Sequence, residues 1–488
     1  MDVPFLSRRR DRYAARRSWR SLPRRHVSRC IWLGGRGVCD GPRVISRVGL
    51  GLSALALAAC TDAVTLEIAG DRPVPTAIDA LCVGIADTDT SGGQFGSPYR
   101  LEGDLDHLPQ TLRVEPGSAS DAWAWVRGDR GGVPVARAAA RVDFSSDVAL
   151  SLDRCERGPS GAPSTIGDPA GPPAAKLAAS QGQGGTLVIA AGAGVQILDA
   201  RSGALVATDA PVANGVVLDV IAADLDRDCD DDIVLVIEGN APLLWRRDGA
   251  TFVELGQLGS LAMAAVDAAD VDHDGDLDLV AGGNGTLALW LNDGAGGFTQ
   301  GDAQLSSGGR ATDIRAVALG DVDGDGNTDL VVGQRSLPLV AWLGDPDGTG
   351  SFRASDAVVP PVPLDVASLS LVDADADFDP DLAVALRSGP MRLYIDRDGR
   401  LEDQSFVRLP QPPPSALAIA FGGWDEGCEP DAILASSTSA FFSGTPTGEL
   451  SADADAPPAT DAIFADIDDD GDLDALLATS EGVVWLAR

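Results

Sequence analysis

The residues best suited to do chemistry in this chain are aspartates that recur at alternate positions in short segments. The stretch DVDHDGDLD, which begins at Asp270, carries aspartate at its first, third, fifth and ninth residues. Residues two apart in an extended chain lie about 6.6 Å from one another, and carboxylates at that distance repel by roughly 0.6 kcal/mol in water. Calcium would relieve this repulsion, because it takes roughly six to eight oxygen ligands and such a loop offers carboxylates and a main-chain carbonyl from its seventh residue. The pattern therefore predicts calcium-binding loops.

This spacing recurs along the second part of the chain. The pattern starts at Asp224, Asp270, Asp321, Asp373 and Asp466, and a decayed copy, GWDEGCEPD, starts at Gly423 and is expected to be metal-free. Glycine follows the fifth position in three copies, where the chain must turn sharply: Gly275, Gly326 and Gly471. Cys229 stands at that position in the first copy.

The Asp loops have two alternative interpretations. An EF-hand loop starts in the same way but needs an acidic twelfth residue and flanking helices, whereas the twelfth residues here are Ala281, Val332 and Leu477 within strand-like runs. Solvated turns without metal are the other alternative. Five near-complete copies at regular intervals favour metal loops over both.

The intervals between the copies indicate the architecture. Successive copies start 46, 51, 52, 50 and 43 residues apart, close to the length of one four-stranded propeller blade. A strand-like run precedes and follows each copy, and a third run with an aromatic residue comes next. These aromatic residues are Trp245, Trp290, Trp342, Tyr394 and Trp485. We expect them to pack between blades rather than to stack on a ligand.

The loops and their flanking runs resemble the FG-GAP or VCBS repeats, which form the calcium-loop blades of integrin α-subunit propellers and of many bacterial surface proteins. The resemblance covers residues 175–488 and implies a β-propeller in which the metal loop joins the first and second strands of a blade. It implies side-chain ligands at loop residues one, three, five and nine, in about five Ca²⁺ sites. These ligands are Asp224, Asp226, Asp228, Asp232, Asp270, Asp272, Asp274, Asp278, Asp321, Asp323, Asp325, Asp329, Asp373, Asp375, Asp377, Asp381, Asp466, Asp468, Asp470 and Asp474.

The predicted fold class is all-β, with two domains. Residues 175–488 are expected to form a seven-bladed β-propeller, with six or eight blades as alternatives, and the last blade lacks its outer strand unless a segment near the linker supplies it. Residues 60–155 alternate apolar and polar side chains in short runs, which predicts a small antiparallel β-sandwich. Residues 156–174 are rich in Pro and Gly and are expected to be a linker.

The N-terminal region predicts export and a lipid anchor. Residues 1–59 contain thirteen Arg, and the apolar run from Val48 to Ala59 is the length of a signal-peptide core, too short to span a bilayer. Leu57 to Cys60 resemble the lipobox of bacterial lipoproteins, which implies lipidation of Cys60 and a membrane link through a lipid anchor only. An ordinary secretory signal is the alternative, and the Arg-rich extension is read as a misassigned start or a disordered extension. We therefore expect a bacterial cell-envelope protein, at the outer membrane or cell surface.

Export permits disulfides. Cys82 and Cys155 both lie in the predicted sandwich, and we expect them to bond to each other. Cys229 and Cys428 occupy equivalent places in loops four blades apart, which is too far for a disulfide. These two are not expected to pair.

Composition favours a binding function. The net charge of −36 argues against nucleic acid, and beyond Cys60 the chain has only two histidines, His107 and His273, and one lysine, Lys176. We expect no enzyme, but a binding or adhesion module for an unknown protein or glycan ligand. The alternatives are a polysaccharide lyase or hydrolase, because some relatives of these repeats are attached to such enzymes, and an accessory scaffold of an envelope complex.

Overall fold

The structure of the chain is a computed structural model that describes residues 32–33, 36–37, 64–70 and, with gaps, 78–152 and 164–487. Three gaps fall inside Asp loops, at 376–378, 425–429 and 468–472. Several predicted residues therefore lie outside the described part, namely Cys60, Cys155, Asp377, Cys428, Asp468 and Asp470. The predicted signal region is described only at the paired strands β1 (Trp32–Leu33) and β2 (Arg36–Gly37).

From residue 164 onward the described residues form seven four-stranded antiparallel sheets. The first comprises β11 (Ala174–Ser180), β12 (Leu187–Gly192), β13 (Val195–Asp199) and β14 (Val206–Ala207). The second comprises β15 (Val217–Ala223), β16 (Asp232–Ile237), β17 (Leu243–Asp248) and β18 (Thr251–Gln257), and the third β19 (Ala265–Ala269), β20 (Asp278–Gly283), β21 (Thr286–Asn292) and β22 (Phe298–Gln300).

The fourth sheet comprises β23 (Ile314–Gly320), β24 (Asp329–Gln334), β26 (Val340–Gly344) and β27 (Phe352–Ser355), beside a short pair, β25 (Leu337–Pro338) and β28 (Pro363–Leu364). The fifth comprises β29 (Val366–Val372), β30 (Asp381–Leu386), β31 (Arg392–Asp396) and β32 (Leu401–Asp403), and is followed by the short helix α1 (Ser405–Arg408). The sixth comprises β33 (Ala418–Gly422), β34 (Asp431–Ala435), β35 (Ala440–Ser443) and β36 (Ser451–Asp455).

The seventh sheet joins the two ends of the repeat region. It comprises β37 (Asp461–Ala465), β38 (Asp474–Thr479) and β39 (Gly482–Ala487), and its outer strand is β10 (Ser164–Ala170). β10 pairs antiparallel with β39, with Thr165 opposite Leu486. The prediction of a linker over 156–174 is therefore wrong for this segment, which supplies the strand that the last repeat lacks.

The sheets close into a ring. The first strand of each sheet contacts the first strand of the next, and β37 of the last sheet contacts β11 of the first. The second strands β12, β16, β20, β24, β30, β34 and β38 are buried along their whole length. Strands buried on both faces explain the unbroken apolar runs that follow the Asp loops. The all-β propeller predicted from the repeats is confirmed.

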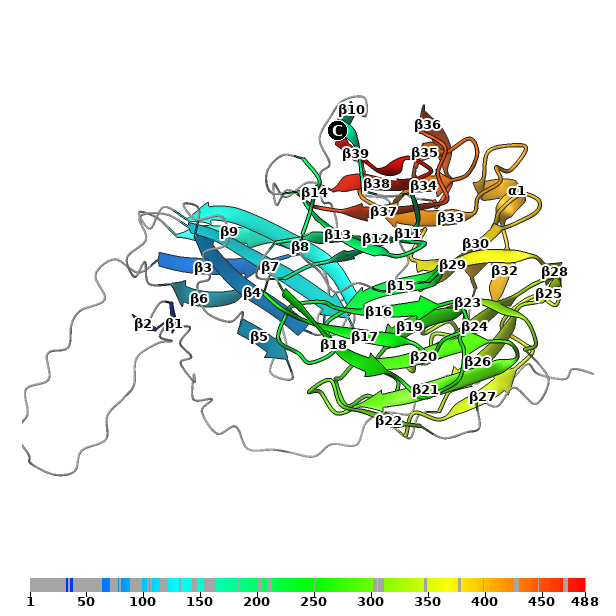
Figure 1. Cartoon of the computed structure of the whole chain (residues 1–488), viewed down its shortest axis with the longest axis horizontal. Helices are drawn as coiled ribbons and strands as arrows, with labels where there is room; N and C mark the ends of the chain where they lie inside the picture. Colours follow the sequence, from blue (N-terminus) through cyan, green and yellow to red (C-terminus); the bar gives the residue numbers. More distant parts are fainter. Residues whose placement is uncertain are drawn as a thin grey trace, which may run out of the picture.

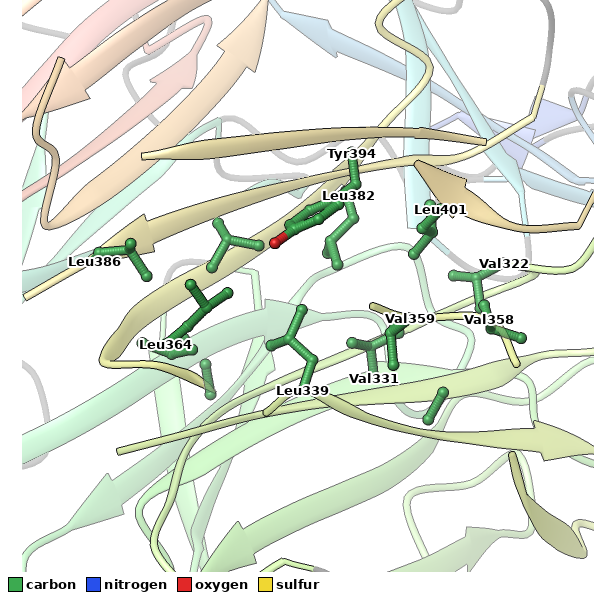
Figure 2. Packing of buried hydrophobic residues seen from close by; sticks show 14 of the residues in the cluster. Val322, Val331, Leu339, Val358, Val359, Leu364, Leu382, Leu386, Tyr394 and Leu401 are labelled. Carbon is green, nitrogen blue, oxygen red and sulfur yellow. The ribbon is translucent and has the colours of Figure 1, made fainter. Parts of the chain in front are cut away.

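The core lies between neighbouring sheets, as Figure 2 shows for the fourth and fifth sheets, where Tyr394 and Leu382 face Leu339 and Val331. The aromatic residue of the third strand belongs to such an interface in each repeat that carries it: Trp245, Trp290, Trp342, Tyr394 and Trp485. All five are at most 5% exposed. The expectation that these rings pack between blades is confirmed.

The N-terminal domain consists of two further sheets, blue to cyan in Figure 1, beside the repeats in green to red. One contains β3 (Val64–Ala69), β6 (Gln110–Val114) and β9 (Val148–Ser151), and the other β4 (Ala80–Asp87), β5 (Tyr99–Glu102), β7 (Ala122–Arg130) and β8 (Val133–Val142). One core cluster takes residues from both sheets, including Leu66 and Val126, as a sandwich requires. The sandwich is not purely antiparallel, because β3 pairs with β9 in parallel.

No helix among the described residues has the length and apolar character needed to cross a membrane.

Candidate metal centre

The Asp loops join the first and second strands of their sheets, as the resemblance implies. The loop from Asp224 leads from β15 into β16, and those from Asp270, Asp321 and Asp373 do the same for β19–β20, β23–β24 and β29–β30. The loop from Asp466 leads from β37 into β38. In every case the ninth residue is the first residue of the second strand, so the strands fix both ends of the loop.

In the first three loops, the first aspartate shapes the loop by accepting hydrogen bonds from the backbone inside it. Asp321 Oδ1 accepts from the amide of Asp325 at 3.1 Å, and its Oδ2 accepts from the amide of Gly326 at 2.9 Å. Gly326 has a φ of 90°, a conformation that glycine adopts without strain. The glycine signal read from the sequence therefore marks a left-handed turn. Equivalent bonds join Asp224 to Asp228 and Cys229, and Asp270 to Gly275.

The turn brings carboxylates together. In four loops, three aspartates each place an oxygen within 4.8 Å of the others: Asp224 with Asp226 and Asp228, Asp270 with Asp272 and Asp278, Asp321 with Asp323 and Asp325, and Asp373 with Asp375 and Asp381. The predicted ligands Asp232, Asp274 and Asp329 lie in the same loops but outside these groups. Asp466 and Asp474 of the last loop are buried, at 2% and 5% exposed.

Buried oxygens without a partner show that a cation fits these groups. Oδ1 of Asp226, Asp270 and Asp375 is buried and accepts no hydrogen bond from the protein. An unpaired buried carboxylate oxygen is strongly destabilising, and a hard cation is the partner that converging carboxylates accept. The residues present therefore fit calcium.

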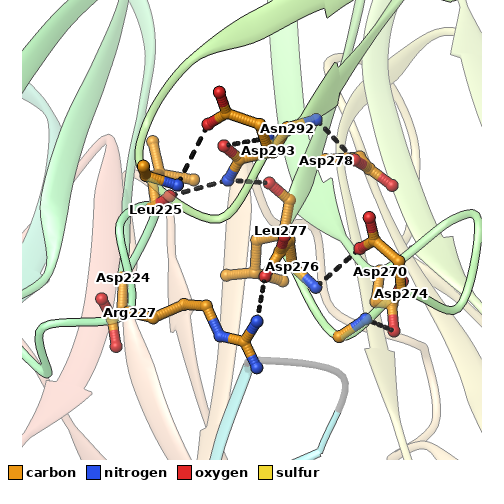
Figure 3. Close-up of polar contacts among 12 residues, drawn as sticks. Asp224, Leu225, Arg227, Asp270, Asp274, Asp276, Leu277, Asp278, Asn292 and Asp293 are labelled. Atoms are coloured by element: carbon orange, nitrogen blue, oxygen red, sulfur yellow. Dashed lines mark hydrogen bonds and ion pairs between the residues drawn. The ribbon is translucent and has the colours of Figure 1, made fainter.

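The ninth aspartate has a second role that sequence reasoning missed. Asp278 Oδ2 accepts from the amide of Val271 in its own loop, and Oδ1 accepts from the amide of Asn292 at the end of β21, both at 2.9 Å. Figure 3 shows the bond from Asn292 to Asp278. One carboxylate thus ties the loop to the third strand. The same pair of bonds occurs at Asp232, Asp329, Asp381 and Asp431.

Asp431 shows that this tie does not depend on metal. It belongs to the decayed loop, in which Gly423 replaces the first aspartate, yet it accepts from the amides of Trp424 at 2.8 Å and Gly444 at 2.9 Å. The decayed copy has therefore kept the residue that holds the sheet together. The sequence signal was present, since aspartate persists at the ninth position while the first and fifth acids are lost.

We expect Asp431→Ala to lower the free energy of unfolding by about 3 kcal/mol, because hydrogen bonds to a charged group contribute roughly 1.5–3 kcal/mol each and two amides, one buried and one partly buried, would lose their acceptor. The loss should be the same with calcium and with chelator, as measured by denaturant unfolding. Asp455→Ala, on the exposed outer strand β36, is the control and should change stability little. A calcium-dependent loss at Asp431 would contradict the structural role.

Burial shifts the titration of the loop carboxyls. Desolvation raises the pKa of Asp278 and of Asp329 to about 7, partly offset by their backbone hydrogen bonds. It raises the pKa of Asp270 to about 6 and that of Asp232 to about 9. Neighbouring aspartates add to the shift in each case. Without a cation, several of these groups therefore hold protons near neutral pH.

The metal-free protein should consequently be more stable in mild acid than at neutral pH. A carboxyl whose pKa is higher in the folded than in the unfolded state contributes stability below the unfolded value, near 4, and this contribution is lost as the pH rises through the folded value. We expect the melting temperature of metal-free protein to fall between pH 5 and pH 7.5, and calcium to remove most of that decline. If the melting temperature of the metal-free protein rises over this pH range, the raised pKa values of these carboxyls are contradicted.

Neighbouring loops also contact one another. Arg227 in the first loop donates from Nη1 to Asp276 Oδ1 in the second at 2.6 Å, and Asn292 Nδ2 donates to the carbonyls of Leu225 and Leu277 (Figure 3). Thr328 in the third loop donates to the carbonyl of Asp270 at 2.7 Å. The first three loops therefore form a connected row on one rim of the ring.

In the loop at Asp373, a predicted ligand itself has arginine partners. Asp375 Oδ2 accepts from Arg397 at 2.9 Å and from Arg408 of α1 at 3.0 Å. The side chains of Asp375 and Arg408 are only 9% and 11% exposed. The carboxylate of Asp375 therefore contacts two guanidinium groups as well as the other carboxylates of its loop.

The disulfide prediction is wrong for Cys82. This residue, in β4, bonds to Cys229 in the first Asp loop, with Cα atoms 6.1 Å apart and 147 residues between them in sequence. Docking of the sandwich against the propeller brings the two sulfurs together, and no pattern within either segment signals that docking. Cys229 does not pair with Cys428, as expected, since it is already bonded.

Lys176, the one lysine of the chain, has a structural role that the sequence did not indicate. It lies on β11, with Nζ 3.9 Å from Asp219 Oδ1 on β15. The carboxylate of Asp461 on β37 accepts from the neighbouring amide of Leu177 at 3.0 Å. Burial lowers the pKa of Lys176, but Asp461 and Asp219 outweigh this effect, so the pKa is raised. This cluster links the first, second and last sheets. His273, by contrast, is exposed in its loop.

A comparison with protein families supports the identification of the Asp loops as repeats. The FG-GAP-like repeat family matches residues 224–281, 270–332 and 321–384, which include the first four Asp loops. A comparison with curated proteins gave no match. Among solved structures, the chain is similar to BBS1N in complex with ARL6DN, as crystals soaked with lead (14% identity, TM-score 0.45, covering 68% of this chain and 97% of that one) and with mercury (13%, 0.44, 68% and 96%). Residues 224–384 therefore carry three FG-GAP-like repeats, which lie within a β-propeller of four-stranded sheets.

Proposed function

We propose that this chain is a cell-envelope lipoprotein whose calcium-stabilised propeller binds a protein or glycan partner. The observation that carries the proposal is the row of Asp loops on one rim of the ring, in which carboxylates converge and buried oxygens lack partners. A fold made of such repeats supports a binding or scaffold role rather than catalysis.

Calcium is the cation that the loops suit best. Carboxylates from three side chains and a main-chain carbonyl form an all-oxygen donor set, which calcium accepts in flexible geometry. Magnesium demands a tighter octahedron. The loops at Asp224, Asp270, Asp321 and Asp373 each bring three carboxylates together, and the loop at Asp466 is a proposed site on the same pattern. Bound calcium would hold the rim in one arrangement and so preserve a binding surface.

The partner can be sought by affinity capture from envelope extract, with calcium and with chelator. We expect partners that are retained in calcium and lost in chelator, and lost equally from a variant with Asp272→Asn and Asp323→Asn. A polysaccharide panel provides the opposing test, since turnover of any member would favour an enzyme over a binding module. Capture that is indifferent to both chelator and variant would argue against a calcium-stabilised binding surface.

The proposed anchor rests on the sequence alone, in the segment that ends at Cys60. Metabolic labelling with an acyl probe should mark the protein, and Cys60→Ala should abolish the label, because the lipid would be attached through that thiol. Labelling that persists in the variant would remove the lipoprotein assignment and with it the membrane tether.

A further inference from the structure

The first Asp loop differs from its neighbours at the residue that makes the turn. Cys229 has a φ of 67°, where Gly275 and Gly326 have 91° and 90°. Its amide nevertheless donates to Asp224 Oδ2 at 3.1 Å, as the glycine amides do to Asp270 and Asp321. The loop thus keeps the metal-binding turn with a residue that disfavours this backbone conformation. A restraint from outside the loop would therefore help to hold Cys229 in this turn.

The disulfide to Cys82 supplies that restraint. Cys82 lies on β4, in the middle of the four-stranded sheet of the sandwich, and is 0% exposed, while Cys229 is 1% exposed. The two sulfurs and a carboxylate oxygen of Asp224 all lie within 4.8 Å of one another. The covalent link to the sandwich therefore sits directly against the first proposed calcium ligand of this loop.

The first Asp loop also differs from the next two loops in how deeply its turn is buried. Asp274 and Asp325, at the fifth positions of the next two loops, are exposed, and so is Gly326. In the first loop, Asp228 is half-buried and Cys229 is buried. The turn of the one loop bonded to the sandwich is thus more buried than the turns of the second and third loops.

We propose that the Asp224 loop is a calcium joint between the two domains, in which the Cys82–Cys229 disulfide holds the loop in its metal-binding form and bound calcium in turn fixes the sandwich to the propeller. The proposal rests on calcium binding by the loops. Coupling between sites is reciprocal, so whatever orders the loop for one partner raises affinity for the other. Couplings of this kind change affinity roughly 5- to 150-fold, and we expect about tenfold here.

The same geometry makes the joint sensitive to reduction. A dithiol reductant would transfer two electrons and two protons to the disulfide, giving the thiols of Cys82 and Cys229 and the cyclic disulfide of the reductant. Cys229 would then be free to leave the left-handed conformation, and the turn that Asp224 caps would loosen. One calcium site would weaken while those at Asp270 and Asp321 keep their affinity.

The test is a calcium titration of the full chain by calorimetry, with small-angle scattering of the same samples to follow the separation of the domains. Cys82→Ser breaks only this disulfide and does not depend on access of a reductant to a buried bond. We expect one site to weaken about tenfold and the radius of gyration to increase. Cys229→Gly should release the sandwich equally but restore part of the calcium affinity, because glycine adopts the turn without restraint. Dithiothreitol should weaken one site in the wild type and none in either variant.

A matched variant separates this inference from the proposed function. Asp272→Asn removes a ligand of the second loop and should abolish one calcium site without changing the response to dithiothreitol. If that site is lost as expected but Cys82→Ser binds calcium like the wild type, the joint is overturned and the calcium sites stand. If the wild type binds no calcium at all, that result contradicts the proposed calcium function, and the calcium joint, which rests on it, is contradicted as well.

Discussion

Millimolar calcium is expected to raise the melting temperature of this protein by roughly ten degrees over its value in chelator. Folded loops bind the ion and unfolded ones scarcely do, so each site adds about 2.7 kcal/mol at a hundredfold excess over its Kd. Three of the four loops with converging carboxylates, those described throughout at Asp224, Asp270 and Asp321, would together add about 8 kcal/mol. Each kcal/mol shifts the midpoint by a few degrees in a domain of ~200 residues and by less in a longer one. Thermal melting followed by circular dichroism provides the measurement.

Single substitutions assign this stabilisation to loops. Asp274→Ala and Asp325→Ala should each lower the number of bound calcium ions by one, because each removes the predicted ligand at the fifth position of a different loop. Asp425→Ala, in the decayed loop, is the matched control and should leave the number unchanged. Magnesium should stabilise less than calcium. Melting that is indifferent to chelator, together with no calcium found by elemental analysis, would show these aspartates to be turns without metal.

The fold was predictable because its repeats carry local signals. An Asp loop, an apolar run and an aromatic residue recur at blade spacing, and each element is fixed by residues within one repeat. Gly326 illustrates this, since its position after the fifth aspartate marks a left-handed turn. Trp245 is another case, because its place in the third strand indicated a position between sheets.

What the sequence did not predict depends on contacts between distant segments. Cys82 and Cys229 lie 147 residues apart, and their pairing follows from how the sandwich docks, which neither segment encodes by itself. The role of the ninth aspartate was obscured for a different reason. Its position suited a metal ligand, and only the third strand, some fifteen residues later, reveals the second hydrogen bond.

The segment 164–170 was misread for a reason of composition. Its sequence STIGDPA contains Gly and Pro, which usually indicate loops, and it follows a Pro- and Gly-rich stretch. An edge strand tolerates Pro because one side of its backbone faces away from the sheet. β10 is such a strand, since only β39 pairs with it in the seventh sheet. Its strand character therefore comes from the partner that it completes.

Removing β10 is expected to destabilise the propeller by several kcal/mol, because the last sheet would lose its outer strand and the ring would lose a link between the two ends of the repeat region. β39 contains Val483, Val484 and Trp485, which are at most 6% exposed. Without β10 its edge would present unpaired backbone groups, a template for aggregation. A chain starting at residue 173 should therefore melt lower than the intact protein and aggregate on heating.

The control for this truncation is a chain that starts at residue 157. It lacks the sandwich and the Cys82–Cys229 disulfide just as the shorter chain does, but it keeps β10, so the difference between the two measures the strand alone. We expect the longer chain to be monomeric and to unfold cooperatively in denaturant, and the shorter one to unfold at a clearly lower midpoint. Adding a synthetic peptide of residues 161–172 should restore part of the loss, because β10 pairs with β39 through backbone hydrogen bonds that a separate strand can also make. Equal midpoints for the two chains would mean that the ring is held by contacts between β37 and β11 and that β10 contributes nothing to its closure.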